Sequence, residues 1–310
     1  MSARVAVANL PATGDSEMEK YINTQDGLTL WTESFGNPEN PPVLLIMGAM
    51  NQGIFWPDEF CERLAAAGFH VIRYDHRDTG KSSTVDFRQA PYDLDILAQD
   101  AIDVIHAYKV EHPIVIGLSM GGYIAQLVAI KHPGVAGMLV LISTSADQRP
   151  YMAATMGQST AGFSLPAPEK RFLDYVESMR QHPPQTPAQM LDSASNGWAV
   201  TYGGQRPYPR SHVERALHLA VERTVDPSAS FHHAFAVAAS PDRLQSVKSV
   251  AVPTLVIHGR DDPCFPLAHG VYLAKHIPDA RLQVFEMGHS FMWSWDDEVL
   301  AAILDFIREK

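Results

Sequence analysis

The sequence predicts an α/β fold with a mostly parallel central sheet, helices on both faces of the sheet, and a helical insertion. Short, continuous apolar runs alternate with amphipathic stretches of helical length up to about residue 145, and again after about residue 249. Apolar runs of this kind are typical of parallel strands buried on both faces, and their alternation with helices indicates a parallel sheet. Between residues 146 and 248 no such run occurs, which predicts an all-helical segment.

Length and composition fit one large domain of this class and restrict its partners. The chain has 310 residues, 46% of them hydrophobic, and a net charge of -11. This charge argues against nucleic acid or an anionic membrane as the main partner. No apolar run approaches the length of a membrane span, and no signal segment is recognisable. The two cysteines, Cys61 and Cys264, fit a reducing cytoplasm without a disulfide.

The core is expected over residues 19–145 and 249–310, and residues 1–18 are expected to form a loose extension. A strand hairpin is predicted at 21–31, because two short strands flank Asp26 and Gly27, which favour a tight turn. Gly68 is predicted to end the helix that precedes it. Further buried strands are expected at 43–47, 69–74, 113–116, 138–142, 254–258 and 282–285, and core helices near 59–65, 94–108, 123–128, 267–276 and 296–307.

The insertion at 146–248 is predicted to be a helical cap over the sheet. Thr186 is followed by a proline and, three residues on, by Gln189, which predicts a capping box at a helix start. Ser211 and Glu214 have the same spacing and predict a second one. Asp226, followed by proline, indicates a third helix start.

The strongest functional motif is Gly117-Leu118-Ser119-Met120-Gly121. It directly follows the strand predicted at 113–116 and precedes an amphipathic helix. A sharp strand-to-helix turn between small residues lifts a serine hydroxyl clear of the sheet, where it can act as a nucleophile. Ser119 is therefore the candidate nucleophile.

A serine hydroxyl needs a base within hydrogen-bond reach and a third group that orients the base. His289 is the candidate base, because it follows the last predicted strand on a loop and comes after a glycine. Ligand sites of open α/β sheets gather at such strand ends. The candidate acid is Asp261 or Asp262, which follow the strand at 254–258.

The sequence resembles the α/β-hydrolases over almost its whole length. Members of that family space a glycine, the acid and a proline as Gly259, Asp262 and Pro266 are spaced here, so the resemblance favours Asp262 over Asp261. It also implies the chain order nucleophile, acid, base. Residues 56–60 and 72–82 are similar to the aclacinomycin methylesterase group, which cleaves carboxylic methyl esters of polyketides. The resemblance implies a serine hydrolase of a small ester, with a methyl ester as one candidate.

The resemblance also implies an oxyanion hole made by the backbone amides of Ala49 and Met120. Many family members have His-Gly where this chain has Met47-Gly48, a departure shared with the methylesterase group. Any residue except proline supplies the amide. No cofactor and no metal site are expected, and the partner is a small-molecule ester.

Four residues are candidates for substrate contact, although the aromatic ones could equally form the core of the cap: Met50, Trp198, Tyr202 and Ser290. A lactonase, a carbon–carbon bond hydrolase or a perhydrolase could use the same three catalytic residues. The non-enzymatic alternative is a small-molecule receptor with this fold, for which a degraded set of catalytic residues would be expected. The oligomeric state is not readable from the sequence.

Overall fold

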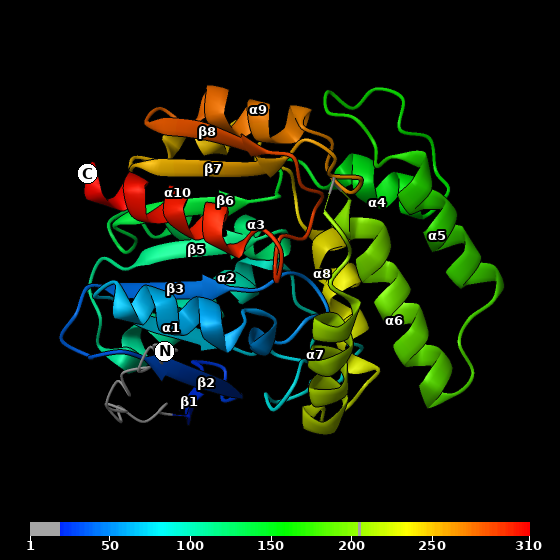
Figure 1. Cartoon of the computed structure of the whole chain (residues 1–310), viewed down its shortest axis with the longest axis horizontal. Coiled ribbons are helices and arrows are strands. Elements are labelled where there is room, and N and C mark those ends of the chain that lie inside the picture. The colour runs from blue at the N-terminus through cyan, green and yellow to red at the C-terminus, as the bar shows by residue number, and fades with distance from the viewer. Residues whose placement is uncertain (1–18, 204–205) are drawn as a thin grey trace, which may run out of the picture.

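The computed structural model describes residues 19–203 and 206–310 (Figure 1). The extension expected at 1–18 lies outside these residues. One eight-stranded sheet has the order β1-β2-β4-β3-β5-β6-β7-β8. β1 and β2 pair antiparallel with each other, β2 pairs antiparallel with β4, and all other pairs are parallel. The strands are β1 (Lys20–Asn23), β2 (Thr29–Phe35), β3 (Pro42–Ile46), β4 (His70–Tyr74), β5 (Ile114–Leu118), β6 (Met138–Ile142), β7 (Thr254–Gly259) and β8 (Ala280–Phe285).

Helices cover both faces of the sheet, as the sequence predicts (Figure 1). On one face, α1 (Asp58–Ala66) and α10 (Asp296–Arg308) pack on one cluster of buried apolar side chains. On the other, α2 (Leu94–Tyr108), α3 (Met120–Lys131) and α9 (Ala268–His276) pack on a second cluster. Every residue of β4, β5 and β7 is buried, as expected for central strands of a parallel sheet covered on both faces. The α/β class is confirmed.

Between β6 and β7 the chain forms five helices and, within its described residues, no strand. They are α4 (Arg149–Thr155), α5 (Lys170–Gln181), α6 (Pro187–Tyr202), α7 (Arg210–Arg223) and α8 (His232–Ala239). They gather beyond the carboxyl ends of the strands (Figure 1). α7 and α8 lie against the sheet domain, and α5 and α6 stand further out. Short 3-10 helices are η1 (Gly53–Phe55), η2 (Ala229–Phe231) and η3 (Ser246–Ser249).

Of the two capping boxes predicted from the sequence, one is found at a helix start and the other is not. The predicted capping box of α6 is confirmed, because the hydroxyl of Thr186 accepts from the backbone of Gln189 and the Gln189 side chain accepts from the backbone of Thr186. The capping box predicted at Ser211 is wrong. The carbonyl of Pro209 accepts the first helical hydrogen bonds, so α7 begins at Arg210 and Ser211 lies inside it.

The predicted hairpin strands are found as β1 and β2, but five residues, 24–28, connect them instead of a two-residue turn. Gly68 follows the end of α1 with a φ of 95°, as predicted for a helix stop. Among the described residues, none of the helices combines the length and apolar character required to cross a bilayer.

Candidate active site

Ser119 lies at the turn between β5 and α3, as the motif predicts. Its backbone angles, φ 55° and ψ −116°, are strained for a residue with a side chain. The flanking glycines explain how the turn closes. A Cβ on Gly117 would lie 2.2 Å from the carbonyl oxygen of Gly121, and a Cβ on Gly121 would lie 2.1 Å from that of Ile46. The serine itself is partly exposed, so the turn presents its hydroxyl at the carboxyl edge of the sheet.

The predicted base and acid are in direct contact. His289 Nδ1 lies 2.9 Å from Asp262 Oδ2 and 3.1 Å from Oδ1. The Asp262 carboxylate is fully buried, whereas the His289 side chain is 12% exposed. Backbone N–H groups of Cys264 and Phe265 donate to Asp262 Oδ1 at 2.8 and 2.9 Å. The carboxylate is therefore held on one side by its own loop and offers the other side to the imidazole.

Electrostatics favour an ionised Asp262. Burial would raise the pKa of this carboxyl, but the charge of His289, its hydrogen bond and the nearby His258 together bring the pKa below its ordinary value. Asp261 is partly exposed, and its recorded hydrogen bonds use its backbone: the N–H donates to the Met287 carbonyl and the carbonyl accepts from Arg171. The geometry therefore favours Asp262 over its neighbour.

Ser119, Asp262 and His289 follow β5, β7 and β8, so all three lie at the same edge of the sheet. Among the described residues, no hydrogen bond joins the Ser119 hydroxyl to the His289 ring. In ligand-free enzymes such a bond is often long and forms only with substrate. The structure thus holds acid and base in contact, at the same edge of the sheet as Ser119.

The loop after β3 approaches Ser119 closely. A Cβ on Gly48 would lie 3.3 Å from the Cβ of Ser119. None of the hydrogen bonds recorded for residues 19–203 and 206–310 uses the backbone N–H of Ala49 or of Met120. Met120 is also the first residue of α3, whose N-terminus carries partial positive charge. Both amides are therefore free to bind a negatively charged oxygen next to the serine.

The four candidate substrate contacts occupy different surroundings. Met50 is 40% exposed on the loop after β3. Trp198 of α6 stacks on Phe55, with ring centroids 5.1 Å apart. Tyr202 and Ser290 are buried. Their contact with a substrate stays a prediction, and Met50 has the most accessible side chain of the four.

The end of α6 holds the loop that carries the base, which sequence reasoning missed. The carbonyl of Thr201 accepts from the N–H of His289 at 2.7 Å, and that of Tyr202 accepts from Gly288 at 2.8 Å. A Cβ at Gly288 would lie 2.1 Å from the Tyr202 carbonyl oxygen. The glycine before the histidine was the available signal, since it permits this close approach.

Asp262, Cys264 and His289 place possible metal-ligand atoms within 4.8 Å of one another. The carboxylate already accepts from the imidazole and two backbone amides. Burial raises the pKa of the Cys264 thiol well above its usual range, which keeps it protonated and a poor ligand. We therefore interpret this cluster as an acid–base pair with a packed thiol.

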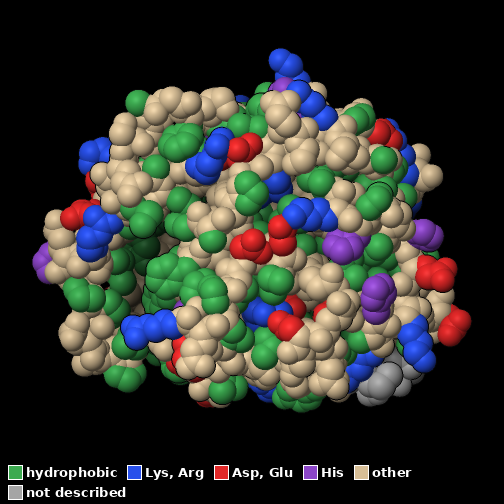
Figure 2. Space-filling view, turned by 180° about the vertical axis from the view of Figure 1, so that it is seen from behind, with side chains coloured by type: hydrophobic (Ala, Val, Ile, Leu, Met, Phe, Trp, Pro, Cys, Tyr) green, Lys and Arg blue, Asp and Glu red, His purple; other side chains and the backbone are tan. Residues whose placement is uncertain are grey.

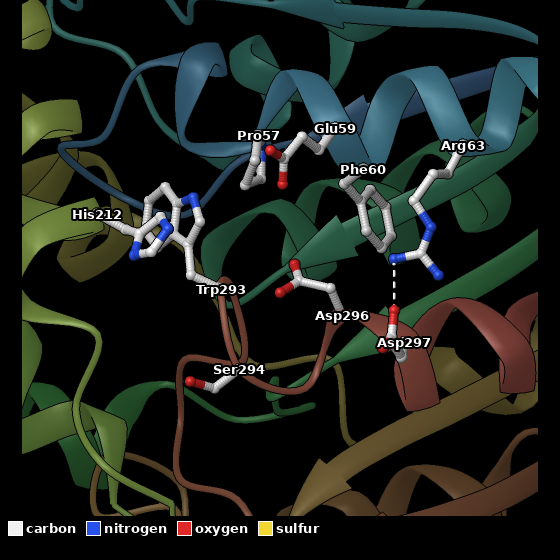
Figure 3. A pocket seen from close by; sticks show the side chains of 9 residues that line it. All are labelled: Pro57, Glu59, Phe60, Arg63, His212, Trp293, Ser294, Asp296 and Asp297. Atoms are coloured by element: carbon white, nitrogen blue, oxygen red, sulfur yellow. Dashed lines mark ion pairs between the residues drawn. The ribbon is translucent and has the colours of Figure 1, made fainter. Parts of the chain in front are cut away.

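A cavity of about 210 Å³ lies between the first turns of α1 and α10 and contains none of the three candidate catalytic residues (Figure 3). Glu59 and Asp296 point toward it, and Arg63 pairs with Asp297 at 2.7 Å. Acids in the first turn stabilise a helix through its dipole. We therefore interpret the acids of this cavity as structural, because they lie in the first turns of α1 and α10.

Comparison with known proteins identifies the family. The family described as alpha/beta hydrolase fold matches residues 41–294. The chain belongs to this family. It is 35% identical to rhodomycin D methylesterase of Streptomyces peucetius, over 94% of this chain and 99% of the relative. It is 26% identical to 3-oxoadipate enol-lactonase 2 of Acinetobacter baylyi, over 86% and 88% of the two chains.

Among solved structures, an esterase from Exiguobacterium antarcticum superposes with a TM-score of 0.75 at 22% identity, covering 94% of this chain and 100% of the esterase. This likeness confirms the α/β-hydrolase fold expected from the sequence.

Proposed function

We propose that this member of the α/β-hydrolase family is a serine hydrolase that cleaves a small carboxylic ester through an acyl-enzyme. Ser119 is the nucleophile, His289 the general base and Asp262 the residue that orients it. The observation that carries the proposal is the buried Asp262–His289 pair at the edge where a strained turn presents Ser119. The similarity to a methylesterase over nearly the full length of both chains supports ester hydrolysis.

The proposed reaction follows from these positions. The Ser119 oxygen attacks the ester carbonyl while His289 takes its proton on Nε2, because Nδ1 faces Asp262. The carboxylate stabilises the imidazolium that forms. His289 then gives the proton to the leaving alcohol, and in the second half it activates water to release the acid.

The amides of Ala49 and Met120 are proposed to bind the oxyanion. Neither amide takes part in a recorded hydrogen bond; Met120 directly follows Ser119, and Ala49 directly follows Gly48, which approaches the Ser119 side chain. Preorganised donors of this kind are among the largest contributions to catalysis, and loss of one typically costs about 3 kcal/mol in barrier height. Neither can be removed by changing its own side chain.

Residues 146–248 are proposed to form the cap that binds the acyl part of the substrate. The surface is hollowed on the side that carries these helices, and hydrophobic side chains surround the hollow (Figure 2). An apolar acyl group fits this lining. We propose a methyl ester of an apolar acid as the substrate, with Met50, Trp198, Tyr202 and Ser290 as candidate contacts.

A lactone is the second candidate, since a relative is an enol-lactonase and the same attack opens a cyclic ester. A receptor role is less well supported, because the positions of nucleophile, acid and base are all filled. Cys61 and Cys264 are buried and free, which supports the reducing cytoplasm as the proposed location.

The test is a panel of aryl acetates, methyl esters of aromatic acids and lactones, assayed on the wild type, Ser119→Ala and Ser143→Ala. Ser143 is a matched control, because it is a buried serine with positive φ, 46°, after the neighbouring strand β6, and its hydroxyl has no hydrogen-bond partner among the described residues. We expect wild type and Ser143→Ala to cleave at least one class and Ser119→Ala to lose turnover. Turnover retained in Ser119→Ala, or absent in the wild type, would contradict the proposal.

A further inference from the structure

His233, a residue of α8 in the cap, contacts the loop that is proposed to form the oxyanion hole. Its side chain is fully buried. Nδ1 lies 3.0 Å from the backbone nitrogen of Met50, and Nε2 lies 2.9 Å from the carbonyl oxygen of Arg77. A backbone N–H can only donate and a carbonyl can only accept. The ring is therefore a neutral imidazole with its hydrogen on Nε2, which satisfies both partners.

The surroundings of this ring keep it in that form. Burial, and next the proximity of His76, lower the pKa of His233 to about 3. The rings of His76 and His233 meet edge to face, with centroids 5.5 Å apart. Nδ1 of His233 thus remains an acceptor throughout the neutral pH range.

The two histidines bind the two ends of one short segment. His76 Nε2 lies 2.9 Å from the carbonyl oxygen of Met47, to which it donates. His233 accepts from the N–H of Met50. Gly48 and Ala49 lie between these two anchors, and Gly48 is the residue that approaches Ser119. The peptide proposed to bind the oxyanion is therefore held from both sides by imidazoles.

The segment requires such anchoring because its backbone is strained. Met50 has a φ of 65°, which is uncommon for a residue with a side chain. Strained conformations persist only where the surroundings hold them. Without the bond from His233, the peptide between Ala49 and Met50 keeps only the hydrogen bond from the Asn51 side chain to the Ala49 carbonyl. Rotation of this peptide as Met50 relaxes would then move the adjoining Ala49.

We infer that His233 is a positioning residue for the oxyanion hole: by accepting from Met50 it orients the Ala49 N–H toward the oxygen that becomes charged. The inference rests on the proposed function. It makes the cap a part of the catalytic geometry in addition to a cover over the substrate.

Two conservative variants separate the two hydrogen bonds. His233→Asn keeps an acceptor near the place of Nδ1, and His233→Gln keeps a donor near the place of Nε2 but loses the acceptor. We expect His233→Gln to lower kcat for p-nitrophenyl acetate on the order of 10²-fold with KM little changed, and His233→Asn to recover most of that loss. His232→Gln is the control, because that neighbouring ring contacts Asp78 and not the loop. Equal kcat values for the Asn and Gln variants, or a change confined to KM, would overturn the inference.

A second readout distinguishes failure of the inference from failure of the proposed function. A p-nitrophenyl phosphonate reacts with an activated serine and leaves a tetrahedral, negatively polarised oxygen in the oxyanion hole. If the wild type is not phosphonylated at Ser119, the proposed function fails. If the wild type reacts, and His233→Gln reacts as fast as His233→Asn, only the inference fails.

Hydrogen exchange of the wild-type protein tests the same hydrogen bond without any variant. The Met50 amide should exchange its hydrogen with solvent slowly, because it donates to a buried ring. Exchange at the rate of an unbonded loop amide would show that His233 does not hold this segment.

Discussion

Two serine–histidine pairs in this protein differ in a way that shows what makes a serine reactive. The hydroxyl of Ser145 lies 2.6 Å from His269 Nδ1, whereas no hydrogen bond between Ser119 and His289 is recorded among the described residues. Ser145 and His269 are, however, completely buried. The other ring nitrogen of His269 faces the carbonyl of Pro166 at 2.9 Å, whereas that of His289 faces the carboxylate of Asp262.

The comparison shows that a short serine–histidine distance does not by itself identify a nucleophile. Ser145 has no strained turn, and its hydroxyl also accepts from the N–H of Asp147 at 2.9 Å, so it closes a loop. Ser119 has the strained backbone, access to solvent, a carboxylate behind its base and two free amides beside it. We therefore assign a structural role to Ser145 and His269 and propose that catalysis belongs to Ser119 and His289, which are partly exposed.

The largest contrast is expected between the two histidines. His289→Gln removes the general base and should lower kcat on the order of 10⁴-fold, because the hydroxyl is then no nucleophile. His269→Gln should leave kcat near the wild-type value and lower the unfolding temperature. Steady-state kinetics and thermal unfolding of both variants measure this contrast. If His269→Gln abolished turnover while remaining folded, the assignment of the two pairs would be reversed.

The carboxylate behind His289 gives the next contrast. Asp262→Asn should lower kcat on the order of 10²- to 10⁴-fold, because the imidazole loses its orienting charge. Asp261→Asn should have little effect, since no hydrogen bond from its side chain to His289 is recorded. The two variants have the same change in charge and volume at adjacent positions. The reverse ranking in kcat would show that the acid had been misassigned.

Ser145→Ala tests the structural role directly. The change leaves the ring of His269 and the N–H of Asp147 without their partner inside the protein. Unsatisfied buried polar groups of this kind cost about 1–3 kcal/mol. Urea unfolding should show a loss of stability of this size, with kcat unchanged. A variant as stable as the wild type would contradict the proposed role of the buried pair.

The buried pair also predicts an acid sensitivity. Burial lowers the pKa of His269 from its ordinary value of 6.5 to about 4. The unfolded chain therefore takes up a proton in this range before the folded chain does. The contribution of His269 to the free energy of unfolding is fully present above pH 6.5. It is lost as the pH falls toward 4, by up to about 3 kcal/mol.

In His269→Gln the unfolding free energy should vary less with pH over this window. Urea titrations between pH 4 and 7 measure the difference in slope, with wild type and variant in the same buffers. Identical slopes would mean that His269 does not titrate as its burial indicates.

Local sequence patterns were sufficient to predict the parts of the site that depend on single loops. The strand-to-helix turn around Ser119 requires small residues at fixed positions, so a motif of five residues is sufficient to predict it. His289 and the pair Asp261 and Asp262 follow strands with their own local signals, but the choice of Asp262 over Asp261 depended on the family resemblance. The capping box at Thr186 has the same character, since both partners lie within one turn of helix.

Contacts between distant segments left no such pattern. His233 lies 183 positions from Met50, and Ser145 lies 124 positions from His269. Each partner alone looks like an ordinary polar residue, and only packing of the cap on the sheet brings them together. The prediction at Ser211 failed for a local reason: the carbonyl of Pro209, two positions earlier, accepts the first helical hydrogen bonds.

The most direct test of the account is to identify the serine that carries the acyl group. The wild type would be mixed with p-nitrophenyl trimethylacetate, whose crowded acyl group is released slowly, then quenched in acid and mapped by peptide mass spectrometry. The account predicts an acyl group on Ser119, released together with a burst of nitrophenol. An acyl group on Ser145, or on any residue other than Ser119, would contradict it.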